Sequence, residues 1–347
     1  MNPNRALLFL IASVFVTGAT ITACGKSIHT QPDAQPPLNP SVPSPSVDRS
    51  TLPPQPSANE SAAFWKFWGD GNAEVDSYKT TQSRYGELRE GYSVLVFVTE
   101  EISRTSRIKV ESDAIPKDDR IPVLKLNRVL KFPTGIYDYS MLTSTFDAIG
   151  AEFGNHPWQA MKISNTTQEW CGSFFGMWRT NNDALYYTRY SYFQSEGDMD
   201  NVRYNLPNDE WEYEDNLPIL IRELDGAWMK TGDAKNVMLM PSFQHQRFTH
   251  DSIAFLPATI KKEDGGDIKI GSKTCPATTH WTWLYTDGKT KVSEEYWTEA
   301  DYPHRIVQWK SSDGSSGELL VSERQPYWSQ HDNAHANMRK EFEIPEN

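Results

Sequence analysis

Short segments that alternate apolar and polar residues constrain the fold more than any other feature. Residues 123–130 are one example, with apolar side chains on one face and charged ones on the other. A repeat of two residues is typical of a β-strand with one buried face. Further strands are predicted at 92–99, 107–110, 160–164, 185–193, 252–260, 281–285, 291–297, 305–311 and 318–322. Turn sequences such as Thr286-Asp287-Gly288 join neighbouring strands, which indicates an antiparallel meander.

Few segments indicate helix. Residues 64–68 predict a short aromatic-rich helical turn that ends at Gly69. Residues 215–224 predict a second helix, with Asp215 or Asn216 as the N-cap and Pro218 in the first turn. Strand–helix alternation is absent, which argues against a doubly wound nucleotide-binding sheet. We therefore expect a mainly β fold: a large curved antiparallel sheet, half-barrel-like, wrapped around a helix or a ligand. Two packed sheets are the alternative.

The first 23 residues predict a signal peptide. Arg5 supplies a positive charge, residues 6–16 form a short apolar run, and small residues follow. Ile21-Thr22-Ala23-Cys24 resembles the bacterial lipobox, whose cysteine is acylated and becomes the new N-terminus. The alternative is an uncleaved transmembrane helix, for which residues 6–23 are long enough. Because no aspartate follows Cys24, we expect a lipoprotein of the outer membrane that faces the periplasm.

Residues 24–60 predict a disordered tether behind the lipid anchor. Nine of the 22 prolines lie between residues 25 and 59, among Ser, Gln and Asn. Such a segment has too few apolar residues to offset the entropy lost on folding. Extended at about 3.1 Å per residue, it reaches on the order of 100 Å. The remaining chain divides into a β-rich globular body at 61–330 and a polar C-terminal tail at 331–347.

Composition narrows the partners of this body. The 12 Trp, 15 Tyr and 15 Phe residues predict a packed aromatic core. The formal net charge is −12, and lysine and arginine are scattered along the chain. A protein that binds nucleic acid concentrates basic residues on one surface, so no nucleic-acid partner is expected.

Cys171 and Cys275 remain once Cys24 is acylated. Exported proteins commonly pair such thiols in a disulfide. Closing a loop of about 100 residues in this way stabilises a fold by roughly 4–5 kcal/mol. We expect a disulfide between them; two buried, unpaired cysteines are the alternative.

Catalytic motifs are sparse. No Gly-x-Ser-x-Gly sequence is present to position a nucleophilic serine. His331 and His335 are spaced for a helix but lack a third ligand nearby, so neither a metal nor a cofactor is predicted. Glu169 and Asp138 are the best candidates for an acid in a hydrolase. Acidic residues beside tryptophan or tyrosine more often form hydrogen bonds within a turn.

An aromatic cluster is the strongest functional signal. Its members lie on adjacent predicted strands and either fill the core or line a cleft for an apolar ligand. The candidate ligand-binding residues are Trp281, Trp283, Tyr285, Tyr296 and Trp297, with Trp309 nearby.

Several motifs carry a resemblance across most of residues 62–330. They include Asp70-Gly71-Asn72-Ala73-Glu74, Arg84-Tyr85-Gly86-Glu87, Thr134-Gly135-Ile136-Tyr137-Asp138-Tyr139 and Gln168-Glu169-Trp170-Cys171-Gly172. The chain resembles a family of uncharacterised bacterial lipoproteins whose members are often labelled "septum formation inhibitor Maf". That label implies a nucleotide pyrophosphatase with a Ser-Pro-Arg-Arg motif in an α/β fold, and this sequence contains no such motif. Residues 251–320 are more weakly similar to periplasmic lipid-carrier half-barrels of the lipoprotein-localisation type.

These observations favour a non-enzymatic cell-envelope lipoprotein that binds a hydrophobic ligand or an envelope partner. An envelope hydrolase that uses Glu169 or Asp138 is the alternative. A carrier should contain a dry, continuous cleft, whereas an enzyme should gather two or more titratable groups in one cavity.

The anchor gives the first testable prediction. Cys24→Ser should abolish incorporation of a fatty-acid analogue, because only this cysteine lies in the lipobox-like sequence. The variant should also leave the membrane fraction or accumulate as the unprocessed precursor. Metabolic labelling measures the outcome, and label that persists in Cys24→Ser would contradict the assignment.

Overall fold

The computed structural model describes residues 62–345 except 150–151, 154–155 and 252. The predicted signal peptide, Cys24 and the proline-rich tether lie outside these residues. In the described part of the chain, no helix combines the length and apolar character needed to cross a bilayer.

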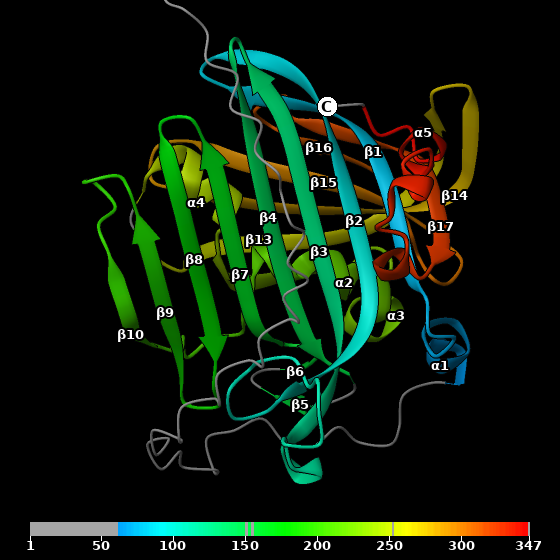
Figure 1. Ribbon diagram of the computed structural model, residues 1–347. Coiled ribbons are helices and arrows are strands. Elements are labelled where there is room, and N and C mark those ends of the chain that lie inside the picture. Colours follow the sequence, from blue (N-terminus) through cyan, green and yellow to red (C-terminus); the bar gives the residue numbers. More distant parts are fainter. Residues whose placement is uncertain (1–61, 150–151, 154–155, 252, 346–347) are drawn as a thin grey trace, which may run out of the picture. The chain divides into compact units, whose positions relative to one another are not determined.

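Fifteen strands of the described chain form one sheet (Figure 1). They are β1 (Ala73–Arg84), β2 (Glu87–Ser103), β3 (Arg120–Thr134), β4 (Tyr137–Ala148), β7 (Ala160–Glu169), β8 (Gly172–Thr180), β9 (Ala184–Ser191), β10 (Met199–Asn205), β11 (Trp211–Tyr213), β12 (Ala234–Met240), β13 (Leu256–Ile270), β14 (Lys273–Thr286), β15 (Lys291–Glu299), β16 (Ile306–Ser311) and β17 (Ser316–Gln325). A separate short pair contains β5 (Glu152–Phe153) and β6 (His156–Pro157).

The strand order is β10-β9-β8-β7-β4-β3-β2-β1-β17-β16-β15-β14-β13-β12-β11. β1 and β17, the first and last strands along the chain, are neighbours in the interior of the sheet. Glu74 of β1 is opposite Arg324 of β17. Among the described neighbours, only β11 and β12 are parallel. The sheet is open, since β10 and β11 occupy its two edges. This arrangement confirms the mainly β, antiparallel prediction, with one large sheet instead of two packed sheets.

Five short α-helices accompany the described strands. They are α1 (Ala62–Trp68), α2 (Leu217–Glu223), α3 (Asp225–Trp228), α4 (Phe243–Thr249) and α5 (Met338–Glu341). Short 3-10 turns add η2 (Lys117–Asp119), η3 (Glu214–Asn216), η4 (Tyr327–Ser329) and η5 (Asn333–His335). The two helices predicted from sequence correspond to α1 and to η3 followed by α2, so both predictions are confirmed.

The largest core cluster surrounds α2. Its residues come from both arms of the sheet: Leu95 and Leu126 on one arm, and Trp281 and Ile260 on the other. Leu220 of α2 is fully buried among them. The sheet therefore curves around this helix, which Figure 1 shows between β2 and β3 in front and β13 behind.

A buried ion cluster fixes α2 against β1. Arg222 Nη1 lies 2.6 Å from Glu74 Oε1 and 4.0 Å from Asp76 Oδ2. Its guanidinium carbon lies 4.0 Å from the centre of the Phe97 ring, and Nε donates a hydrogen bond to the Pro303 carbonyl at 3.1 Å. The side chains of Arg222, Glu74 and Asp76 are almost entirely buried.

One predicted strand is wrong. Residues 107–110 lie in the loop between β2 and β3, with a single bridge between Ile102 and Lys109. Arg107 has a φ of 59°, which an extended strand cannot accommodate. Its side chain instead donates a hydrogen bond to the Thr180 carbonyl at 3.0 Å. The segment predicted at 252–260 begins as a strand only at Leu256.

The C-terminal segment packs on the outer face of the sheet. Phe342 is buried there beside Val75, Val94 and Val96. The predicted tail at 331–347 is therefore partly anchored by an apolar contact.

Candidate functional site

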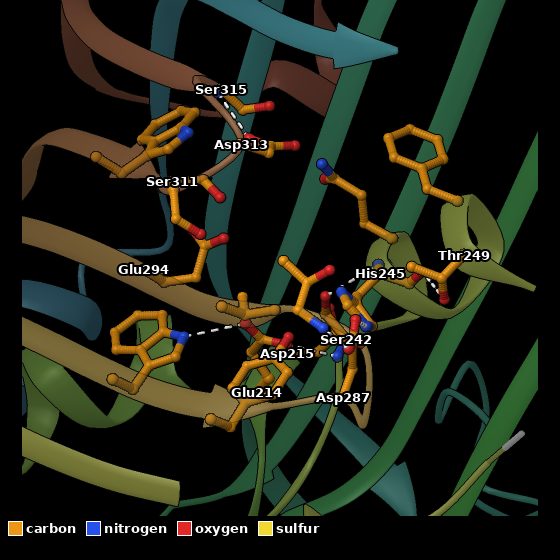
Figure 2. A pocket seen from close by; sticks show the side chains of 18 of the residues that line it. Glu214, Asp215, Ser242, His245, Thr249, Asp287, Glu294, Ser311, Asp313 and Ser315 are labelled. Atoms are coloured by element: carbon orange, nitrogen blue, oxygen red, sulfur yellow. Dashed lines mark hydrogen bonds and ion pairs between the residues drawn. The ribbon is translucent and has the colours of Figure 1, made fainter. Parts of the chain in front are cut away.

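A cavity of about 280 Å³ lies between the two arms of the sheet, beside α4. Figure 2 shows Glu294 and the β16–β17 turn on one side, and His245 and Thr249 of α4 across from them. The lining residues are Gln82, Arg128, Glu214, Asp215, Ser242, Gln244, His245, Phe248, Thr249, Trp283, Tyr285, Asp287, Thr290, Lys291, Val292, Glu294, Tyr296, Trp309, Ser311, Ser312, Asp313 and Ser315.

Glu214 is the most firmly held carboxylate in the cavity. It accepts hydrogen bonds from Trp283 Nε1 at 3.0 Å, the Tyr285 hydroxyl at 3.1 Å and the Ser242 amide at 2.7 Å. These donors come from β14 and from the residue that caps α4. Glu214 belongs to η3, directly before α2, so the packing of α2 determines where this carboxylate lies.

Asp215 lies next to Glu214 and titrates near neutrality. Burial raises the pKa of Asp215 to about 7, although the hydrogen bond from the Phe243 amide, 2.8 Å long, opposes the shift. The adjacent Glu214 also raises this pKa, while Arg128 lowers it. Asp215 is therefore partly protonated at pH 7.

Glu294 faces the same space from β15. Burial raises the pKa of Glu294 well above its ordinary value, and the neighbouring Glu214 adds to the shift. Arg128 opposes it and donates a hydrogen bond to the Tyr296 hydroxyl at 3.4 Å. The Arg128 guanidinium carbon lies 5.3 Å from the centre of the Trp309 ring.

The cavity wall combines negative charge with aromatic rings. Five carboxyl residues line it (Glu214, Asp215, Asp287, Glu294 and Asp313), against Arg128, Lys291 and one histidine, His245. Burial raises the pKa of Asp215 and of Glu294, which reduces the negative charge of the wall. The rings of Trp283 and Tyr296 stack with their centres 4.6 Å apart. The Trp309 ring stacks in turn on Tyr296, with centres 6.1 Å apart, and the Arg128 guanidinium lies over it. The carboxyl groups are therefore what a further cation would contact.

His245, Asp251 and Asp287 gather at the edge of the cavity. One potential ligand atom from each lies within 4.8 Å of the others. The Lys289 ammonium group, however, pairs with Asp251. Asp287 accepts hydrogen bonds from the Lys289 and Thr290 amides, which lower its pKa although burial acts in the opposite direction. The cluster is therefore an ion-pair network in which the Lys289 ammonium group supplies the positive charge.

The predicted aromatic residues divide into three groups. Trp283, Tyr285 and Tyr296 line the cavity. Trp281 is fully buried in the core, where its ring stacks with Trp228. Trp297 lies on the opposite face of β15 and stacks on His280, with ring centres 4.5 Å apart. Trp283, Tyr285 and Tyr296 belong to the same buried core cluster as Trp281, so the core interpretation holds for all four, and ligand binding by the three that border the cavity stays a prediction.

The predicted acids do not share this cavity. Glu169 accepts a hydrogen bond from the Cys171 amide at 2.6 Å and lies 3.5 Å from Arg247. Asp138 is exposed on β4. The structure therefore does not bring Glu169 and Asp138 into the cavity lined by Glu214.

The predicted disulfide is absent from the structure. Cys171 and Cys275 both have free thiols in the described chain. Cys171 is exposed in the turn between β7 and β8, and Cys275 belongs to β14, in the other arm of the sheet. The expected pairing relied on cysteine number, which carries no information on strand order.

Glu214, Asp215 and Glu294 were not recognised from the sequence as site residues. Asp215 was assigned only a helix-capping role. Glu294 lies two residues before Tyr296 in a predicted strand, so the two-residue period already places both on one face. That signal could have identified Glu294, whereas the contacts of Glu214 depend on tertiary structure.

Comparison with known proteins adds no relative: no family model, curated protein or solved structure matches the chain. The family resemblance noted from sequence motifs remains a prediction.

The buried carboxyls predict how stability depends on pH. The pKa of an aspartate in an unfolded chain is about 3.9, whereas that of Asp215 is about 7 in the folded protein. Between these values the folded state binds more protons, so the free energy of unfolding should fall as pH rises from about 4 to about 7. Burial raises the pKa of Glu223 to about 7 as well, and its contribution has the same sign.

Urea unfolding at pH 5 and pH 8 measures the effect. The free energy of unfolding should differ between the two pH values by roughly 1–3 kcal/mol less in Asp215→Asn than in the unmodified protein. Each tenfold change in proton affinity is worth about 1.4 kcal/mol. Asp138→Asn, which changes an exposed aspartate, is the matched control, and its free energy of unfolding should depend on pH as that of the unmodified protein does. An unchanged pH dependence in Asp215→Asn would contradict the assignment.

Proposed function

We propose that this chain is a cell-envelope lipoprotein, anchored through Cys24, whose β-sheet body binds a small organic cation in the acidic cavity. The observation that supports this most strongly is the placement of Glu214. Three hydrogen bonds hold its carboxylate at a wall built from Trp283, Tyr285 and Tyr296. The outer membrane, facing the periplasm, is the proposed location.

The polar lining of the cavity disfavours an acyl chain as the ligand. An acyl chain would displace water from Glu214, Asp215 and Glu294 without offering any hydrogen bond, and burying unpaired polar groups costs free energy. An ammonium or guanidinium group can instead donate charge-assisted hydrogen bonds to the Glu214 carboxylate. We therefore narrow the expected hydrophobic ligand to a compact organic cation.

The volume sets a limit on size. Pockets for small molecules commonly range from about 300 to 1,000 Å³, and this cavity of about 280 Å³ is slightly smaller than that range. A single amine or guanidine compound fits this volume better than a chain of sugars or a phospholipid.

Acid–base catalysis in the same cavity is a second candidate. The specific observation is that Asp215, with a pKa of about 7, and Glu294, whose pKa burial raises, flank Glu214. Carboxyls in unequal environments can divide acid and base roles. Recovery of the bound compound chemically unchanged after prolonged incubation would favour binding over catalysis.

Calorimetric titration with small amines and guanidines tests the proposal. Glu214→Gln should weaken binding about 10- to 100-fold, because a hydrogen bond to a charged group contributes roughly 1.5–3 kcal/mol. Affinity should also increase as pH rises through about 7, where Asp215 ionises. Glu101→Gln changes an exposed carboxylate on β2 and should leave affinity unchanged.

A different ligand class would give the reverse result. If a fluorescent fatty acid binds, and if Glu214→Gln strengthens its binding by removing a buried charge, the cation proposal is wrong and the carrier hypothesis is restored.

A further inference from the structure

Hairpin turns at one end of the sheet expose large apolar side chains. Ile136 is 81% exposed, Tyr192 73%, Trp170 72%, Leu88 61% and Tyr85 57%. They belong to, or adjoin, the β1–β2, β3–β4, β7–β8 and β9–β10 connections, which lie along the upper edge of the sheet in Figure 1. We call these five residues the apolar rim.

The opposite ends of the same strands have polar connections. Residues 104–106 follow β2 with Arg-Thr-Ser, and residues 181–183 join β8 to β9 with Asn-Asn-Asp. Polar residues and glycine are typical of such turns because they form local hydrogen bonds or adopt positive φ. Five large exposed apolar side chains thus gather at the rim, whereas Ile108 and Trp65 are exposed elsewhere, in the loop after β2 and on α1.

Contacts connect individual rim residues to the neighbouring hairpins. The hydroxyls of Tyr85 and Tyr139 are 2.6 Å apart, which joins the first hairpin to β4. The rings of Tyr137 and Trp170 lie 6.3 Å apart, which joins the β3–β4 and β7–β8 turns. The Tyr192 ring covers the backbone of Gly172 so closely that an added Cβ would lie 2.6 Å from it.

Several charged side chains beside the rim have local partners. Arg89 contacts Glu87 at 2.6 Å, and Arg247 lies 3.5 Å from Glu169. The Arg84 guanidinium lies over the Tyr85 ring, 4.2 Å from its centre. The rim therefore offers mainly apolar and amphipathic groups to a partner, with the exposed Asp138 as a charged neighbour.

We propose that the apolar rim inserts into the interface of a phospholipid bilayer. Tryptophan and tyrosine favour this region because each has an apolar ring and a polar group, while Ile136 and Leu88 can enter the acyl-chain boundary. The rim is a row of separate side chains on successive hairpins, and this shape suits a flat surface. Because the protein has a net charge of −12, attachment relies on apolar contacts and not on anionic lipid.

The chain that precedes the β-rich body is long enough for the Cys24 lipid and the apolar rim to contact one bilayer. β1 begins next to α1 and ends at the rim, so α1 lies at the far end of the sheet. The longest strand has 17 residues, or about 55 Å at about 3.3 Å per residue. The 37 residues between Cys24 and Ala62 span roughly 115 Å when extended at about 3.1 Å per residue. A lipid on Cys24 and the rim can therefore reach the same membrane.

Two natural cysteines provide an experiment. The mature chain from residue 24, with Cys24→Ser to remove the acyl chain, is labelled with an environment-sensitive fluorophore at Cys171, next to Trp170. The control is labelled at Cys275, on β14, and each protein has serine at the other cysteine. With phosphatidylcholine vesicles, emission at Cys171 should increase and shift to shorter wavelength, while emission at Cys275 should not change.

Substitutions separate this proposal from its alternatives. Ile136→Ser and Trp170→Ser should each weaken vesicle binding at least tenfold. Ile108→Ser is the matched control, since Ile108 is also exposed but lies in the loop after β2. An equal effect of Ile108→Ser, or no change in emission at Cys171, would overturn the proposal. So would sedimentation showing a dimer that Ile136→Ser dissociates, because a second copy would then occupy the rim. None of these readouts depends on the cavity ligand.

Discussion

The buried contact between Arg222 and Glu74 determines where helix α2 lies, and much of the structure depends on that position. Nη1 of the arginine is 2.6 Å from the glutamate in a site with almost no solvent exposure. Burial, reinforced by Glu74, raises the pKa of Asp76 well above its ordinary value, so Arg222 and Glu74 form the principal ion pair. β1 pairs with both β2 and β17, which places this contact where the two arms of the sheet meet.

The acidic cavity follows from this arrangement. Glu214 and Asp215 immediately precede α2, so fixing the helix also fixes their backbone. Donors from Trp283, Tyr285 and Ser242 then satisfy the Glu214 oxygens. Grouped carboxyls destabilise a folded protein through burial and mutual repulsion. Arg128 offsets part of this cost, and in the proposed function a bound cation supplies further positive charge.

Many strands with apolar buried faces were predicted from the sequence, although β8, with buried Phe174 and Trp178, and β12 were not. On β14, Trp281, Trp283 and Tyr285 recur with period two, and all three face inward. β1 was not predicted because its buried positions include Glu74, Asp76 and Gln82, which a hydrophobic pattern cannot detect. These residues are tolerated inside only because distant partners reach them.

The site was less predictable than the fold for the same physical reason. Glu214 contacts residues about 70 positions away along the chain, and no local pattern encodes such a contact. Trp297 was predicted as a ligand-binding residue but does not line the cavity. Its neighbour Tyr296 faces the cavity, and adjacent residues of a strand point to opposite faces. Strand parity could have separated them, whereas the pairing of the two arms required the three-dimensional structure.

The most direct test of this account is the free energy of unfolding of Arg222→Met. Methionine preserves much of the side-chain volume but leaves Glu74 and Asp76 without a buried cation, so we expect a loss of about 3–5 kcal/mol. Arg203→Met, which changes an arginine at the surface, should cost less than about 1 kcal/mol. Urea denaturation measures both variants. If Arg222→Met is as stable as Arg203→Met, the ion pair does not hold α2 in place and the proposed origin of the cavity is wrong.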